Sequence, residues 1–348
     1  MMAQHPHDGV DGARTPIAKA RPRRRWLRRI VLSALLVVLF VIVWWGIGRL
    51  AAPGRAVRII DAQSAQASAP TEHDTARTTL RIATWNIAHG RGLSEDTFNS
   101  ESDAARLDRL HAIADQLRAH DLDIVILNEV DFDATWSSNI NQAAIIAQRS
   151  GYNWRVEQRN VDTSVPFFAL RFGNVILSRV PIRAAVLLDF PWHSRFESIV
   201  AGGKKGVVAT LEFDDDMLIR VAAMHLDHRW GGQSTRMEAA RMLRRHATDG
   251  GPPLILGGDF NTSLPGFPGV RARRVSETAL SILLEDDLFQ TSPMADPGPD
   301  DFTFRANDPT RVIDWILIPR SWTLLSREVL STDLADHRMV IVEVERTP

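Results

Sequence analysis

The chain has 348 residues and contains no cysteine. This absence excludes disulfide bonds, thiolate metal sites and cysteine nucleophiles. It does not locate the protein, because a chain without disulfides is compatible with any compartment. A hydrophobic content of 45% and a charged content of 24% are typical of a globular protein with one large domain or two ordinary ones. The sequence shows no internal repeat.

An apolar segment near the N-terminus is long enough to span a membrane. Residues 30–48, IVLSALLVVLFVIVWWGIG, contain no charged residue, and a helix of about 20 residues crosses a hydrocarbon core of roughly 30 Å. Trp44 and Trp45 near its end suit the headgroup level, where amphipathic rings are favoured. We therefore expect one transmembrane helix over residues 30–50.

The charges on either side of this segment predict its orientation. Six arginines lie between residues 21 and 29, against Arg49, Arg55 and Arg58 on the other side. The positive-inside rule then places residues 1–29, a basic N-terminus, in the cytoplasm and the rest of the chain outside it. A cleaved signal peptide is the alternative, since small residues follow, but its apolar region usually spans only about 7 to 15 residues. The length favours an uncleaved anchor.

The rest of the chain divides into a linker and one large domain. Residues 51–78 are small and polar without sustained periodicity, which predicts a linker, and residues 79–348 form the domain. Residues 1–78 hold 12 basic and 5 acidic residues, which leaves 29 basic and 37 acidic in the domain. Double-stranded nucleic acids are normally bound by a basic surface, so an acidic domain weakens that expectation. Metal-binding acids would supply part of the excess.

Periodicity in the domain predicts many strands and a few helices. Ser102 or Asp103 is a plausible N-cap for the first helix, and Gly151 ends the second. This mixture indicates an α/β domain with mixed sheets covered by helices. The helices are expected over 102–120, 139–151, 234–247 and 277–286, and the strands over 79–87, 123–130, 152–158, 174–179, 182–190, 206–213, 218–226, 254–256, 301–305, 311–318, 322–330 and 338–345.

Polar residues recur at the ends of these expected strands. Each alone has an ordinary explanation, such as an Asn in a turn or a satisfied core histidine, but ligands of layered α/β folds gather where strand ends converge. Carboxylate and amide oxygens suit Mg²⁺, Mn²⁺ or Ca²⁺, and a hard cation beside histidines suits phosphoryl chemistry. The residues are Asn86, Glu129, His225, His228, Asp259, Asn261, Asp314, Asp336 and His337.

The stretch PPLILGGDFNTSLPG, residues 252–266, contains two of them. A buried strand ends in two glycines and is followed by Asp259 and Asn261. On an extended chain these two side chains project from one side, while Phe260 turns into the core.

In order along the chain, TWNI, NE, GGDFN and DHR resemble the endonuclease/exonuclease/phosphatase superfamily over about residues 80–345. The resemblance implies a four-layer α/β sandwich, two mixed β-sheets flanked by helices, here preceded by one N-terminal transmembrane helix. It implies a metal site of Glu129 with Asn86 and Asp336, for Mg²⁺ or alternatively Mn²⁺ or Ca²⁺. The remaining roles that it implies are Asp259 for the water, Asn261 for the phosphate, His337 paired with Asp314, His225 as a second phosphate-facing histidine, and Asn174 as support for the substrate.

Two departures from the family pattern stand out. The usual QE is NE through Asn128, and Ala88 stands where apurinic endonucleases have a second acid. In the turn NIAHGRG, His89 and Arg91 either contact a substrate phosphate or are solvated; arginine suits the first role.

These observations predict a membrane-anchored, metal-dependent phosphoesterase with its catalytic domain outside the cytoplasm. A phospholipid headgroup or a small phosphorylated metabolite is favoured as substrate over DNA, and no protein partner is inferred. The alternatives are an extracytoplasmic nuclease and a non-catalytic binding module. Specificity is expected in the loops 159–173, 191–206 and 262–274. There Phe167, Phe168 and Trp192 form an apolar rim near a bilayer or pack the loops, and packing is favoured.

Overall fold

The computed structural model describes residues 23–62, 78–96, 101–192, 194, 202–213, 217–228, 232–268 and 277–346. The chain divides into two compact units, residues 1–44 and residues 45–348. Residues 1–22 of the expected cytoplasmic N-terminus and parts of the loops expected at 191–206 and 262–274 lie outside the described residues.

Helix α1 (Arg23–Ala51) contains the expected apolar segment. Within it, Arg25–Ala51 is long and apolar enough to cross a membrane, and none of its most apolar stretch is buried among the described residues. A helix without a polar face or a burying partner is typical of a membrane anchor or of a signal sequence.

The expected linker contains regular structure. Strand β1 (Val57–Asp61) follows the short helix η1 (Pro53–Arg55) and pairs antiparallel with β4 (Trp154–Val165), so that Val57 lies opposite Gln158. Three of its five residues are β-branched, which favours extended backbone. The compact unit therefore begins before residue 79, while residues 63–77 lie outside the described part of the chain.

The catalytic part consists of two mixed β-sheets, as expected. The seven-stranded sheet has the order β1–β4–β5–β3–β2–β13–β12 and the six-stranded sheet the order β10–β11–β9–β8–β7–β6. The pairs β2·β3 and β8·β9 are parallel, and the other neighbours are antiparallel. The further strands are β2 (Thr79–Asn86), β3 (Ile124–Asp131), β5 (Phe168–Ser178), β6 (Ile182–Asp189), β7 (Lys205–Glu212), β8 (Leu218–His225), β9 (Leu254–Asp259), β10 (Phe289–Gln290), β11 (Asp314–Pro319), β12 (Thr323–Leu330) and β13 (Met339–Glu345).

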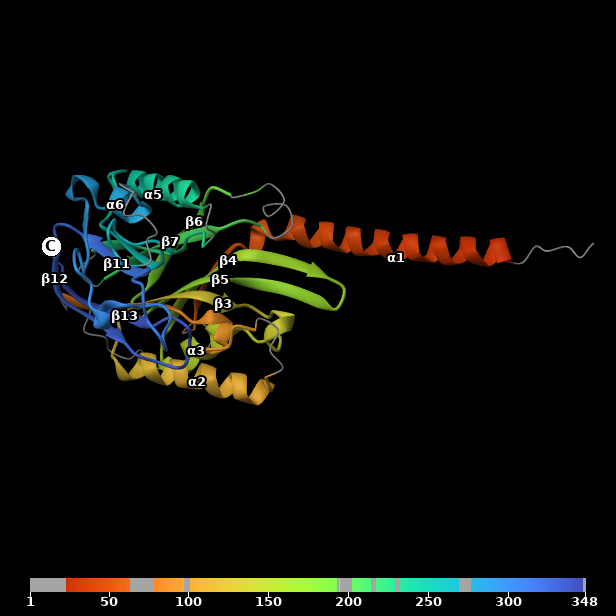
Figure 1. Ribbon diagram of the computed structural model, residues 1–348, viewed down its shortest axis with the longest axis horizontal. Coiled ribbons are helices and arrows are strands. Elements are labelled where there is room, and N and C mark those ends of the chain that lie inside the picture. Colours follow the sequence, from red (N-terminus) through yellow and green to blue (C-terminus); the bar gives the residue numbers. More distant parts are fainter. Residues whose placement is uncertain are drawn as a thin grey trace, which may run out of the picture. The chain divides into compact units, whose positions relative to one another are not determined.

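Helices cover the outer face of each sheet, which completes the four layers (Figure 1). Helices α2 and α3 lie on the seven-stranded sheet, and α5 and α6 lie on the six-stranded sheet. Between the sheets, one apolar cluster joins residues of both, among them Ile82, Ile126 and Val221. The helical elements are α2 (Asp103–Ala119), α3 (Gln142–Ser150), α5 (Gln233–Ala247), α6 (Ala279–Leu283), η3 (Ala88–Gly90), η4 (Thr135–Ser137), η5 (Glu285–Asp287) and η6 (Pro299–Asp301).

Two expected elements differ from the structure. Residues 301–305 form no strand, since Phe304 makes only isolated bridges. Strand β11 begins at Asp314, because the N–H groups of Ile313 and Asp314 donate to the Thr303 hydroxyl. Asp314 is therefore the first residue of its strand and not a middle one.

The loop expected at residues 159–173 is largely strand. The strands β4 and β5 continue through it as a hairpin paired as far as Val165 and Phe168. Figure 1 shows this hairpin extending beyond the end of β3. Its sequence, RNVDTSVPFFALRFG, is mainly polar up to the tip, a composition that favours a loop over a strand.

Candidate active site

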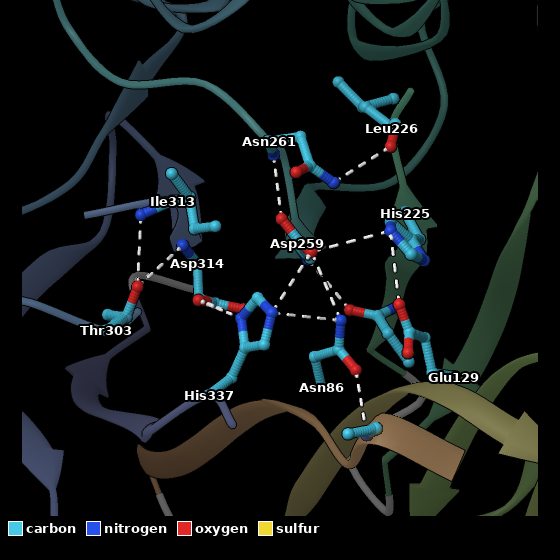
Figure 2. A network of polar contacts seen from close by, with 12 residues as sticks. Asn86, Glu129, His225, Leu226, Asp259, Asn261, Thr303, Ile313, Asp314 and His337 are labelled. Atoms are coloured by element: carbon cyan, nitrogen blue, oxygen red, sulfur yellow. Dashed lines mark hydrogen bonds and ion pairs between the residues drawn. The ribbon is translucent and has the colours of Figure 1, made fainter. Parts of the chain in front are cut away.

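The strand pairing brings the polar strand ends together. Across the parallel pair β2·β3, Asn86 lies opposite Asn128, and across β8·β9, His225 lies opposite Asp259. Asp314 of β11 lies opposite Asp259 from the other side. Most of the polar residues expected from the strand ends therefore form one cluster at one end of the two sheets (Figure 2).

Two glycines allow the end of β9 to lie close to its neighbours. A Cβ atom on Gly257 would lie 2.3 Å from Ile126 Cδ1, and one on Gly258, whose φ is 142°, would lie 1.8 Å from the Met224 carbonyl oxygen. No larger side chain fits at either position without moving the backbone or the core. Because these positions lack side chains, β9 packs closely against β8 and against β3 of the other sheet, directly behind Asp259.

Asp259 and Asn261 are held by a turn and not by an extended chain, in contrast to the expectation. The Asn261 N–H donates to Asp259 Oδ1 at 2.8 Å, and Asn261 has a left-handed φ of 48°. The Asn261 amide nitrogen donates to the Leu226 carbonyl at 3.1 Å. Phe260 is fully buried between them, as expected. The turn arises because asparagine tolerates this conformation and the carboxylate accepts the local N–H.

The second carboxylate oxygen of Asp259 is the centre of the cluster. Asp259 Oδ2 lies 3.2 Å from Asn86 Nδ2, 3.5 Å from His225 Nε2 and 3.8 Å from His337 Nε2. Burial raises the pKa of Asp259, the His337 imidazolium lowers it, and the charge of Asp314 raises it again. The resulting pKa is about 7. A carboxylate with such a pKa is suited to accept a proton at neutral pH.

His337 is oriented by Asp314. His337 Nδ1 lies 2.8 Å from Asp314 Oδ2, and Asp314 is fully buried. Burial lowers the pKa of His337, but Asp314 and Asp259 outweigh it and raise that pKa to about 10. The ring is therefore an imidazolium whose Nε2 points toward Asp259 and Asn86 (Figure 2).

Glu129 lies at the accessible side of the cluster. Its side chain is 20% exposed, its backbone has a φ of 53°, and its carboxylate lies 3.2 Å from His89 Nε2 and 3.9 Å from His225 Nε2. Burial raises the pKa of Glu129, but His89, His225 and His337 lower it further, to below its ordinary value. Glu129 is therefore ionised and accessible. The pKa of His225 is lowered, chiefly by burial and by Lys204.

His89 is neither solvated nor at the surface. Its Nδ1 lies 2.7 Å from Asp131 Oδ1, its side chain is 12% exposed, and the rings of Trp136 and Phe172 pack against it with centroids 5.0 Å away. Burial lowers the pKa of His89, but Asp131 and Glu129 raise it more. Sequence reasoning missed this pairing, because nothing local relates residue 89 to Asp131.

A second layer of amides supports the cluster. Asn128 Oδ1 accepts a hydrogen bond from the Asp259 N–H at 2.8 Å, and its amide nitrogen donates to Asn174 Oδ1 at 2.7 Å and to the Met224 carbonyl at 3.0 Å. Asn128 therefore links the two sheets. Asn174 is fully buried behind it and also donates to the Lys205 carbonyl at 3.1 Å, so its contact with a substrate stays a prediction.

The expected metal ligands fit a hard cation. Asp336 Oδ1 is buried without a hydrogen-bond partner among the described residues. The pKa of this carboxyl is raised, because burial and the charge of Glu129 raise it more than His337 lowers it. A cation would satisfy such an oxygen. Asn86 Oδ1 accepts from the Ala88 N–H at 3.0 Å and retains a second lone pair. Asp259, Asp314 and His337 also lie within 4.8 Å of one another, but Asp314 and His337 already bind each other.

Comparison with known proteins agrees with this fold. A model of the Endonuclease/Exonuclease/phosphatase family matches residues 83–337. No curated protein sequence matches the chain. Among solved structures, an endonuclease/exonuclease/phosphatase from Beutenbergia cavernae DSM 12333 is similar with a TM-score of 0.60 and 21% identity, covering 77% of this chain and 72% of that one.

Two further solved structures carry more specific names. The catalytic domain of human Nocturnin, solved with a bound sulfate anion, has a TM-score of 0.55 and 16% identity, and the match covers 85% of this chain and 98% of that one. A mannosyl-6-phosphatase of Bacteroides thetaiotaomicron has a TM-score of 0.52 and 19% identity, and the match covers 76% of this chain and 99% of that one. At these identities the similarity shows the shared fold.

Proposed function

The chain belongs to the endonuclease/exonuclease/phosphatase family, whose members are metal-dependent hydrolases of phosphoester bonds, and we propose that it is a membrane-tethered phosphoesterase acting outside the cytoplasm. The observation that supports this most is the surroundings of Asp259 Oδ2, which has Asn86, His225 and His337 within 3.8 Å. A base, two imidazoles and an amide around one point suit the hydrolysis of a phosphate ester.

We assign the roles from this geometry. Asp259 orients a water molecule and accepts its proton as the water attacks phosphorus in line with the leaving oxygen. The Asn261 side-chain amide, which also donates to the Leu226 carbonyl, and the His225 ring beside Asp259 hold non-bridging oxygens of the phosphate. His337, kept protonated by Asp314, stabilises the charge that develops on these oxygens.

The metal site is proposed at Glu129, Asn86 and Asp336. A bound Mg²⁺, or alternatively Mn²⁺ or Ca²⁺, would offset charge on the phosphoryl oxygens and on the leaving group. Glu129 is suited to be the principal metal ligand, because its carboxylate is ionised and its side chain is 20% exposed. Asp336 supplies the buried oxygen that lacks a donor. Ala88 adds no ligand, so the proposed set holds two carboxylates and one amide.

Helix α1 is the proposed membrane tether. It is long and apolar enough to span, and the six arginines between residues 21 and 29 outnumber Arg49, Arg55 and Arg58 beyond the apolar segment, which favours a cytoplasmic N-terminus and an extracytoplasmic catalytic domain. An extracytoplasmic nuclease is the second candidate, since the fold is shared by nucleases, but the acidic domain disfavours it. A binding module without activity is disfavoured because Asn86, His225, Asp259, Asp314 and His337 are buried together, and buried polar groups are costly without a function.

The proposal is tested with the full-length protein purified in detergent. We would measure hydrolysis of a nitrophenyl phosphomonoester, a bis-nitrophenyl phosphodiester and plasmid DNA with Mg²⁺ or Mn²⁺. Asp259→Ala is expected to lower kcat on the hydrolysed ester by at least about 100-fold, the scale of losing a base or one electrostatic group. Activity that survives in Asp259→Ala would refute the mechanism, and plasmid nicking with steep salt dependence would favour the nuclease.

A further inference from the structure

The residues that follow the apolar segment are fixed on the β4–β5 hairpin. A Cβ atom on Gly48 would lie 3.1 Å from Ser164 Oγ, and Arg49 Nη1 donates to the Asp162 carbonyl at 3.3 Å. Arg55 binds the Asp162 carboxylate with both Nε and Nη2, at 2.8 and 3.1 Å. Residues 48–55 are therefore held on this hairpin, and β1 continues the contact by pairing with β4.

The hairpin tip is apolar and exposed. Phe167 is fully exposed and Phe168 is 38% exposed, so the expected packing of Phe167 against the loops is wrong. The uncharged segment ends at Gly48, which lies against Ser164, and the three residues from Ser164 to Phe167 reach at most about 10 Å. The hairpin tip therefore lies near Gly48, the residue at which the uncharged segment ends. An exposed phenylalanine ring there suits the boundary between the headgroups and the acyl chains of a bilayer, where apolar side chains of interfacial segments are buried.

The catalytic cluster lies at the same end of the domain. A Cβ atom on Gly202 would lie 3.3 Å from Arg49 Nη1. Two residues further along the chain, the Lys204 ammonium interacts electrostatically with both Glu129 and His225. Two residues span at most about 7 Å. Strand β3 also runs toward the hairpin tip, because Asp131, two residues after Glu129, lies opposite Phe172 of β5. Residues 202–204 and the end of β3 therefore place the accessible side of the cluster at the end of the domain that holds the tether.

A second aromatic side chain belongs to this loop. Trp192 is 49% exposed, and its ring lies 3.3 Å from the position of a Cβ atom on Gly203, between Gly202 and Lys204. Tryptophan is enriched where one side of the ring meets lipid and the other meets water. The tip and the loop therefore place two exposed aromatic side chains at the end that holds both the tether and the site.

We propose that this end of the domain rests on the bilayer, with Phe167 at the boundary between headgroups and acyl chains and Trp192 in the headgroup region, and that the site hydrolyses a phosphate ester in the headgroup of a membrane lipid. This inference rests on the proposed phosphoesterase activity and membrane tether. A substrate confined to the same membrane is present at high effective concentration, whereas a site facing the bilayer is poorly placed for a long nucleic acid.

The first test measures where the hairpin tip lies. The chain has no cysteine, so Phe167→Cys in the full-length protein, reconstituted in phospholipid nanodiscs, accepts one polarity-sensitive fluorophore. The matched control is Leu325→Cys, 49% exposed on β12 at the opposite edge of the same sheet. We expect the label at 167 to be quenched by spin-labelled lipids and protected from aqueous iodide, and the label at 325 to behave oppositely. Equal iodide quenching at both positions would overturn the proposal.

The second test concerns the substrate. Nanodiscs containing phospholipids are assayed for headgroup release, in parallel with a soluble nitrophenyl phosphate ester and plasmid DNA. We expect hydrolysis of lipid, and we expect Phe167→Asp to lower kcat/KM on lipid about tenfold while the rate on the soluble ester changes less than twofold. Leu325→Asp, the matched charge on a remote exposed leucine, should change neither rate.

The outcomes separate this inference from the proposed function. Hydrolysis of the soluble ester or of DNA, without hydrolysis of any lipid tested, would overturn the lipid substrate and leave a phosphoesterase. Equal loss on lipid and on the soluble ester in Phe167→Asp would overturn the role of the tip. If no phosphate ester is hydrolysed with either metal, the proposed function fails, and the fluorophore at position 167 still decides whether the tip contacts the bilayer.

Discussion

The Asp314 carboxylate lies 2.8 Å from His337 Nδ1, and Nε2 of the same ring lies 3.8 Å from Asp259. Thr303 holds Asp314 in turn, by accepting its backbone N–H at 3.2 Å. One imidazole thus connects a fully buried acid with the acid proposed to take the proton from water. The ring can neither flip nor lose its Nδ1 proton without breaking this contact.

Asp314→Asn tests this relationship directly. The amide keeps the shape but removes the charge that raises the pKa of His337, so we expect kcat to fall about 10- to 100-fold, the usual scale for such supporting residues. KM should change little, because the substrate contacts remain. The measurement is steady-state hydrolysis of whichever chromogenic ester the wild type cleaves. Asp308→Asn, an exposed position in the preceding loop, is the control, and an unchanged kcat in Asp314→Asn would contradict the role.

Glu129→Gln tests the metal site without relying on activity. A cation that binds only the folded protein stabilises it by about 2.7 kcal/mol at a concentration 100 times its Kd. We expect Mg²⁺ or Mn²⁺ to raise the Tm of the wild type, and to leave that of Glu129→Gln nearly unchanged because the accessible carboxylate is lost. Glu238→Gln, exposed on α5, should keep the full increase. An equal metal-induced increase in Glu129→Gln would place the metal elsewhere.

The four layers could be predicted because their signals are local. The side chain of Ser102 caps α2 by accepting the Ala105 N–H at 3.2 Å, and Gly151 ends α3 with a left-handed φ of 82°. Both were expected from residue type and helical spacing. The polar residues at strand ends were also visible, because a buried strand that ends in Asp or His needs a reason.

What depends on long-range pairing could not be predicted. His89 and Asp131 are 42 residues apart, and Asn128 and Asp259 are 131 apart, so no local pattern relates them. Strand β1 is short, and only its partner β4 makes it a strand. The turn at Asn261 was missed for a different reason. Strand alternation was extended two residues too far, although a carboxylate two residues before an asparagine favours a turn.

The topology across the membrane is tested with the same cysteine-free chain. Ser326→Cys lies on the exposed part of β12, and Gln4→Cys lies before the basic stretch. If the positive-inside rule holds, a membrane-impermeant maleimide added to intact cells, with the outer envelope permeabilised where there is one, labels Ser326→Cys. It labels Gln4→Cys only after lysis. The reverse pattern would show that the catalytic domain is cytoplasmic.

Asp162 links the segment that follows α1, through Arg55, to the β4–β5 hairpin by a charge network. Its side chain is 4% exposed and pairs with Arg55 and Arg159 at 2.8 and 2.9 Å, and with Arg171 at 3.3 Å. Burial raises the pKa of Asp162, but hydrogen bonds from Arg55 and Arg159 lower it to below its ordinary value. The stabilisation is therefore complete above the pKa of the unfolded chain, and it is lost as pH falls through the lower folded pKa.

We therefore expect Asp162→Asn to lower the free energy of unfolding at pH 7. Breaking a fully buried pair costs roughly 3 to 5 kcal/mol, and because Arg55 and Arg171 are partly solvated we expect about 2 kcal/mol here. Denaturant unfolding over a pH series should show the difference from wild type shrinking below pH 4. Asp115→Asn, which breaks an exposed pair with Arg149, should be indistinguishable from wild type. If the difference in the free energy of unfolding between Asp162→Asn and wild type did not change with pH, the charge of Asp162 would not be what fixes Arg55 to the hairpin. In that case Asp162→Asn should also leave the accessibility of a label at position 167 unchanged.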